Sequence, residues 1–179
     1  MKLNQIFLSI AMLFAVCFLG CSSDDDNGGD TPTDGVTFEI SGEVEGEKSG
    51  FANVVQVEES GITQIFISMN DGITGVQTFS LILYLSNTGQ DAEIPSVGEY
   101  SIGTPAVGDF WVVYTDIGNG DSVEYGSIWG ASGTLTITGS TPNRLTGQFE
   151  FTAEGNVDSM GVPTGSIEVT NGQFSAQVQ

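Results

Sequence analysis

The sequence predicts an all-β fold, either an antiparallel β-sandwich or a flattened β-barrel of about ten short strands. From Val36 onward, apolar and polar residues alternate with a period of two. Val, Ile, Phe, Thr and Tyr, which favour strands, are frequent, and Gly, Asn, Asp and Pro interrupt the pattern at short intervals. No segment after Leu19 has the apolar period of an amphipathic helix.

The expected strands are, in chain order, Val36–Gly42, Gly50–Val57, Ile62–Met69, Val76–Ser86, Gly98–Ile102, Phe110–Thr115, Ser122–Trp129, Gly133–Thr138, Arg144–Ala153, Gly165–Thr170 and Gln173–Val178. Turns are expected at Asn70-Asp71-Gly72, Asn119-Gly120 and Thr141-Pro142-Asn143, because Gly and Asn accept a positive φ and Pro presets its own. Asn171-Gly172 predicts a bulge or kink rather than another hairpin.

Two strands show how the alternation assigns faces. One face of segment 144–153 is apolar and the other polar, which is typical of a half-solvated antiparallel strand. Segment 76–86 is apolar on both faces, with Phe79, Leu81, Leu83 and Leu85 on one and Ile82 and Tyr84 on the other. We expect this second strand to be central and covered on both faces.

The first 20 residues resemble a bacterial lipoprotein signal peptide. Lys2 precedes an uncharged apolar run, Ile6 to Leu19, which is shorter than the ~20 residues of a transmembrane helix. Gly20-Cys21 follows, so we expect cleavage after Gly20 and lipidation of Cys21. Two or more acyl chains would anchor the protein stably to a membrane. The alternative is an ordinary secretory signal with a chance cysteine, which would leave an unpaired thiol.

The segment after Cys21 carries a second targeting feature. Ser22-Ser23-Asp24-Asp25-Asp26 resembles the export signal of Bacteroidota surface lipoproteins, which implies the outer face of the outer membrane. A solvated acidic linker is the alternative. Residues 21–35 have no sizeable apolar side chain after Cys21, and we expect a disordered tether there. Residues 36–179 are then a single β domain.

Composition excludes several classes of function. Without residues 1–20, Lys48 and Arg144 are the only basic residues against 23 acidic ones. Such a chain repels the phosphates of nucleic acids and anionic lipids. The chain has no His, which excludes Ser-His-Asp and Cys-His catalysis and His-ligated metals.

Paired carboxylates are the remaining candidate catalytic groups. Glu150, Glu154 and Glu168 lie near apolar strands, but nothing in the sequence pairs them, and a solvated sheet face explains them better. We therefore expect no enzyme activity.

The second half of the chain resembles a known family. Gly133–Thr138, Leu145–Ala153 and Val169–Phe174 are similar to an uncharacterised family of small Bacteroidota lipoproteins. That family combines a lipobox with a β-rich domain ending in G-x-F-x-F-x-A and T-N-G-x-F, and Gly98–Gly103 also fits its middle. The resemblance implies the same location and β fold, and it supplies no catalytic residue.

The hairpin around Asn119-Gly120 is the candidate ligand site. If these residues form the turn, Tyr114 faces Tyr125 and Phe110 faces Trp129 on one side of the ladder. Such aromatic residues suit a platform for sugar rings or the lining of a cavity for a lipid-like ligand. The opposite side, with Trp111, Val113, Ile117 and Ile128, is also apolar. The alternatives are that both faces are covered or that the register differs.

The same hairpin offers two further candidate sites. Asp116, Asn119 and Asp121 supply oxygen ligands of the kind that calcium prefers, although a plain solvated hairpin tip explains them too. No other cofactor is expected. Asp121-Ser122-Val123 and Asp158-Ser159-Met160 resemble the Asp-Ser/Thr-apolar site of Bacteroidota O-glycosylation, so Ser122 and Ser159 are candidate acceptors.

Together these features favour a non-catalytic binding or accessory module, lipid-anchored at the outer membrane and facing the cell exterior. A glycan or another small envelope or nutrient molecule is the expected ligand. The alternative is a structural or protein-interaction subunit of a cell-envelope complex, docked through a strand edge or an apolar patch.

Overall fold

The computed structural model describes residues 35–59, 62–72, 77–85, 93–104, 109–118, 121–156 and 164–179. These residues form ten strands: β1 Gly35–Gly42, β2 Gly46–Glu59, β3 Ile62–Asn70, β4 Phe79–Leu85, β5 Gly98–Ile102, β6 Phe110–Gly118, β7 Asp121–Gly126, β8 Ala131–Thr141, β9 Arg144–Glu154 and β10 Ser166–Val178. The predicted signal peptide, Cys21, the tether, Asn119 and Ser159 lie outside the described residues. In the described segments, no helix is long and apolar enough to cross a bilayer.

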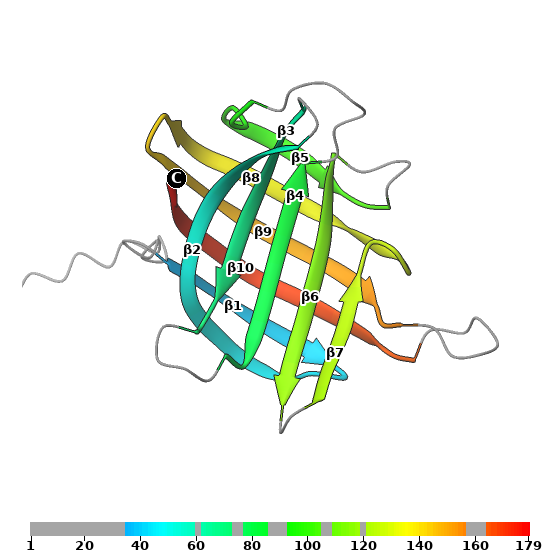
Figure 1. Ribbon diagram of the computed structural model, residues 1–179. Helices are drawn as coiled ribbons and strands as arrows, with labels where there is room; N and C mark the ends of the chain where they lie inside the picture. Colours follow the sequence, from blue (N-terminus) through cyan, green and yellow to red (C-terminus); the bar gives the residue numbers. More distant parts are fainter. Residues whose placement is uncertain are drawn as a thin grey trace, which may run out of the picture. The chain divides into compact units, whose positions relative to one another are not determined.

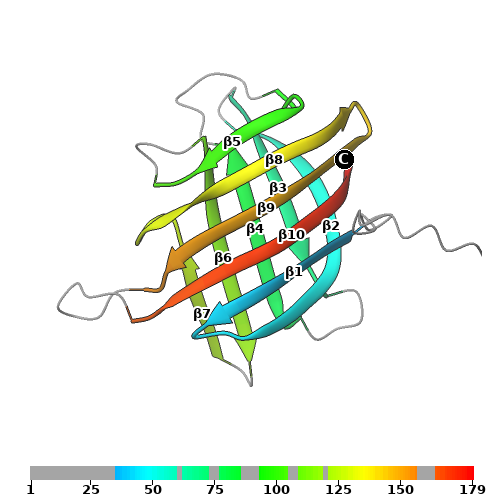
Figure 2. The same ribbon diagram turned by 180° about the vertical axis from the view of Figure 1, so that it is seen from behind.

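The strands close into a barrel, which confirms the all-β prediction and decides between its two forms. Pairing runs in the order β4-β3-β2-β1-β10-β9-β8-β5-β6, and β6 pairs back with β4 to complete a nine-stranded ring. β7 is the tenth strand and pairs with β6. Figures 1 and 2 show two opposed walls: a front wall of β2, β3, β4 and β6, and a back wall of β1, β10, β9, β8 and β5.

Most predicted strands are present, with shifted ends. β7 ends at Gly126 rather than Trp129, because the chain turns there and the N–H groups of Trp129 and Gly130 both donate to the Gly126 carbonyl at 3.1 Å. The last two predicted segments form one strand, β10, whose register shifts between Val169 and Gly172. Asn171 lies at this shift with a φ of 54°, so the predicted bulge is confirmed.

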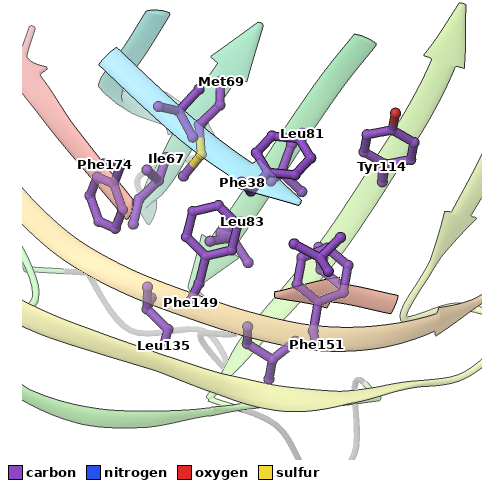
Figure 3. Close-up of a cluster of buried hydrophobic side chains, with 14 of the residues drawn as sticks. Phe38, Ile67, Met69, Leu81, Leu83, Tyr114, Leu135, Phe149, Phe151 and Phe174 are labelled. Atoms are coloured by element: carbon purple, nitrogen blue, oxygen red, sulfur yellow. The ribbon is translucent and has the colours of Figure 1, made fainter. Parts of the chain in front are cut away.

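The core fills the space between the two walls. Along β9 the odd-numbered residues from Leu145 to Ala153 are buried and the even-numbered ones are half-buried or exposed, as the alternation predicts. Phe38 lies at the centre, with its ring centroid 5.3 Å from that of Phe79, 6.3 Å from Tyr114 and 5.9 Å from Phe149 (Figure 3). The barrel interior is therefore packed with aromatic and aliphatic side chains.

Strand β4 differs in part from its prediction. It is central, since it pairs with β3 on one side and β6 on the other. Its inner residues Phe79, Leu81 and Leu83 are fully buried, but Ile82 and Tyr84 are only half-buried on the outer face. The expectation that both faces are fully covered is wrong, because the wall of a barrel has a single inner face.

Replacing Phe38 with Ala should lower the free energy of unfolding by about 3–5 kcal/mol, because it leaves a cavity among three rings. Phe51→Ala is the matched control: Phe51 is 41% exposed on β2, and its loss should cost about 1 kcal/mol or less. Urea denaturation of the full-length protein measures both. Equal losses for the two variants would contradict the packed core.

Candidate functional site

The predicted hairpin forms with the predicted register. Gly118 lies opposite Asp121, and Tyr114 lies opposite Tyr125 with their ring centroids 6.3 Å apart. The β6–β7 ladder then ends at the pair of Val113 and Gly126. The turn signal therefore placed one of the two predicted aromatic pairs correctly.

The predicted ligand-binding residues do not form a surface platform, which corrects that interpretation. Phe110 and Tyr114 are 0% exposed and Tyr125 is 5% exposed, because ring closure turns this face of β6 and β7 inward. Phe110 lies opposite Leu85 of β4 rather than opposite Trp129. Trp129 follows the end of β7 and is half-buried. Three of the four aromatic side chains therefore belong to the core.

Another set of aromatic side chains lies on the outer face of the front wall. Phe66 of β3, Tyr84 of β4 and Trp111 of β6 are neighbours across three paired strands, and we call them the aromatic row. The ring centroids of Phe66 and Tyr84 are 5.6 Å apart, and those of Tyr84 and Trp111 are 4.7 Å apart. All three side chains are half-buried, so part of each ring reaches solvent.

The outer surface around the aromatic row is mixed. Val55 of β2 lies opposite Phe66 and extends the row to a fourth strand. In the next row along the strands, Ser68, Ile82 and Val113 are paired neighbours, and beyond them lie Asn70, Ser80 and Thr115. The outer face of the front wall therefore carries aromatic rings toward one end of its strands and hydrogen-bonding side chains toward the other end.

One side-chain atom of the aromatic row has no hydrogen-bond partner among the described residues. Among the described residues, the Trp111 indole Nε1 is the buried side-chain polar atom that makes no hydrogen bond. A buried donor without an acceptor costs about 1–3 kcal/mol. Such groups are rare in proteins and require a local explanation. An acceptor that reached this nitrogen would remove that cost.

Sequence reasoning identified only part of the aromatic row. It placed Trp111 on the apolar side of the hairpin opposite Tyr114, but it did not connect Trp111 with Phe66 or Tyr84. Their proximity follows from the pairing of β4 with β6, which are not consecutive strands because β5 lies between them in the chain. No local signal in the sequence reports that pairing.

The predicted calcium ligands are not brought together among the described residues. Asp116 points into one end of the barrel, where its Oδ1 lies 3.5 Å from Lys48 Nζ and accepts a hydrogen bond of 3.2 Å from the Tyr114 hydroxyl. Asn119 lies outside the described residues, and only the backbone of Asp121 is described. In the described part of the chain, no group of three or more Asp, Glu, His or Cys residues could hold a metal ion.

The outer face of the back wall is polar. Glu150, Glu154 and Glu168 are exposed there, in agreement with a solvated sheet face. Among the described residues, hollows on this wall include ones with cavity volumes of about 400, 560 and 250 Å³. On β7, the candidate glycosylation acceptor Ser122 is exposed.

Three tyrosine phenols have raised pKa values. Burial raises the pKa of Tyr114 well above its usual 10, and the neighbouring Asp116 carboxylate acts in the same direction. Burial also raises the pKa of Tyr125, with a further contribution from Glu43, and burial raises the pKa of Tyr84. These hydroxyls therefore stay protonated in the folded protein above the pH at which an unfolded chain loses those protons.

No protein-family model, curated protein or solved structure matches this chain. The resemblance to Bacteroidota lipoproteins therefore stays a prediction from the sequence.

The raised pKa values predict a loss of stability in alkali. Above about pH 10 the unfolded chain releases tyrosine protons that the native state retains, so the free energy of unfolding falls as pH rises. The stabilisation is fully present below pH 10. Tyr114→Phe should reduce the alkaline slope by up to about 1.4 kcal/mol per pH unit.

Denaturant midpoints from pH 7 to 11.5 would measure this effect. At neutral pH, Tyr114→Phe should cost only about 1 kcal/mol, for the lost hydrogen bond to Asp116. Equal alkaline slopes for the wild type and the variant would show that Tyr114 does not carry the effect.

Proposed function

We propose that this protein is a non-catalytic binding module, lipid-anchored through Cys21 at the outer membrane and facing the cell exterior, and that it binds a glycan through the aromatic row. The observation that carries the proposal is the placement of Phe66, Tyr84 and Trp111 side by side on the outer face. The location rests on the lipoprotein-like signal and the acidic segment after Cys21.

The chemistry of the row suits sugar rings. A pyranose presents C–H groups on its faces and hydroxyls at its edge, so it needs an apolar surface with hydrogen-bonding groups beside it. The three rings supply the apolar surface, and Ser68 lies in the adjacent row on the same wall. Because the interior is packed, a ligand binds this barrel on its outside.

A second candidate function is a protein-interaction subunit of an envelope complex. Val57 is 40% exposed and lies two residues from Val55 on the same face of β2, so aliphatic side chains extend the aromatic row. An apolar surface that spans several strands is typical of protein interfaces. A stoichiometric partner that leaves the protein when Phe66 is replaced would favour this function over glycan binding.

Tryptophan fluorescence tests the glycan proposal directly. The chain has two Trp residues, so Trp129→Phe leaves Trp111 as the single reporter. Titration of the full-length variant with neutral hexasaccharides of glucose, mannose and xylose should change the Trp111 emission. Adding Phe66→Ala should weaken binding about tenfold or more, because a ring contact is lost.

Phe51→Ala is the control for that experiment. Phe51 is an exposed ring on the same wall, but it lies opposite Asn70, two rows away from Phe66. Its loss should leave the affinity unchanged. Emission that responds to none of the hexasaccharides would argue against glycan binding at the aromatic row.

The anchor is tested by cell fractionation. Cys21→Ser should move the protein from the membrane fraction to the soluble fraction, because no acyl chain can then be attached. Cys17→Ser is the matched control, since Cys17 lies within the predicted signal peptide and its loss should change nothing. Retention of the Cys21→Ser protein in membranes would refute the anchor, and protease digestion of intact cells tests the outward orientation.

A further inference from the structure

A groove with different chemistry is lined by residues of β5, β8, β9 and β10. These strands form the back wall, on the opposite side of the barrel from β3, β4 and β6, which carry the aromatic row (Figures 1 and 2). The groove has a volume of about 400 Å³ and opens on the outer face of β5, β8, β9 and β10. Phe149 and Gly172 are its buried lining residues and form the floor, while its sides carry Glu99, Thr136 and Gln148, among others. We call this hollow the polar groove.

The bulge in β10 shapes the polar groove. Asn171 has the left-handed φ of 54°, and the register with β9 shifts between Val169 and Gly172. At Gly172 an added Cβ would lie 2.5 Å from the Phe149 carbonyl oxygen and 2.6 Å from its ring. Only glycine fits there, so the floor stays open while the bulge turns Asn171 outward to an exposed position.

The sides of the polar groove form a row of hydrogen-bonding side chains across four strands. Glu99 lies opposite Thr136, Thr136 opposite Gln148, and Gln148 opposite Gln173. Neighbouring strands are about 4.8 Å apart, so the row spans about 14 Å. Thr134 and Glu150 form a second, parallel pair beside it. The groove therefore suits an elongated ligand that lies across the strands.

The polar atoms in the groove are available to a ligand. On the same face but outside the groove, the hydroxyls of Ser132 and Thr152 hydrogen-bond each other at 3.1 Å, as do those of Thr138 and Thr146. Within the described residues, the side chains of Thr136, Gln148 and Gln173 make no such bond. The same argument favours this groove over the 560 Å³ hollow, which Ser132 and Thr152 line.

Charge and chemistry define the class of ligand. The described residues of the groove include carboxylates, amides and hydroxyls, but no Lys or Arg. The two basic residues of the domain are engaged elsewhere, Lys48 with Asp116 and Arg144 with Ser175. Glu99 and Glu150 would repel an anion, while both accept hydrogen bonds from hydroxyls, and a side-chain amide can donate and accept.

We propose that the polar groove is a second binding site, which takes a neutral oligosaccharide lying across β5, β8, β9 and β10. It does not depend on the aromatic row, because the two surfaces lie on opposite walls and share no residue.

Residue-resolved NMR tests this site separately from the front wall. Full-length ¹⁵N-labelled protein in detergent is titrated with the neutral hexasaccharides maltohexaose, cellohexaose, mannohexaose and xylohexaose, and with anionic hexagalacturonate. At least one neutral probe should shift the side-chain amide signals of Gln148 and Gln173 and the backbone signals of residues 134–136, and hexagalacturonate should not. Shifts confined to β3, β4 and β6 would overturn the second site while supporting the aromatic row. A larger response to hexagalacturonate, or no response to any probe, would also overturn it.

Variants then identify the contacts. Thr136→Val and Gln148→Ala should each weaken the affinity measured from the groove signals about tenfold, because they remove hydrogen-bonding groups from a half-buried and an exposed position of the groove, respectively. Thr138→Val is the matched control, on the same strand and the same face but outside the groove, and it should change the affinity less than about twofold. Phe66→Ala should also leave these signals unchanged. Equal effects of Thr136→Val and Thr138→Val would overturn the proposed contacts.

Discussion

The pairing of β4 with β6 is the constraint on which the rest of this structure depends. It joins seven residue pairs, from Phe79 with Asp116 to Leu85 with Phe110, and it completes the ring. The other side of β6 has a divided ladder, since β5 contributes one pair, Ile102 with Phe110, and β7 pairs with Val113 to Gly118. Once the ring is closed, every strand has an inner and an outer face, and the hydrophobic effect assigns the apolar face to the inside.

Because the closed barrel has a packed interior, its candidate binding surfaces lie on the outer face. The interior is occupied by buried rings, among them Phe38, whose centroid lies 5.9 Å from that of Phe149 and 6.3 Å from that of Tyr114. These rings contribute to the stability of the packed core. The outer faces are then free to differ. The front wall carries the aromatic row, whereas the back wall carries hydroxyls, amides and carboxylates around the bulge at Asn171. The two walls are therefore suited to different contacts, one by ring packing and one by hydrogen bonding.

The candidate site shows how far sequence reasoning reaches. The turn at Asn119-Gly120 predicted that Tyr114 lies opposite Tyr125, because two-residue hairpins set their own register. The predicted pairing is wrong at the far end of the ladder. The chain turns after Gly126 there, so Trp129 lies beyond the end of the strand. Reading the inward face as a platform was wrong, because both faces of the hairpin are apolar and the pattern alone does not say which is covered. Phe66 and Tyr84 could not be joined to Trp111 without the β4–β6 pairing.

The sequence by itself determined what depends on near neighbours in the chain. The period of two assigned the faces of β9, Gly and Asn marked the turns, and Asn171-Gly172 marked the bulge, since backbone φ preferences act within a few residues. The tertiary structure decided which strands lie side by side and whether the sheet closes as a barrel or opens as a sandwich. These depend on contacts between distant segments, whose free energy comes from the shared burial of side chains such as Phe79 and Phe149. Only this closure placed Phe66, Tyr84 and Trp111 together on one surface.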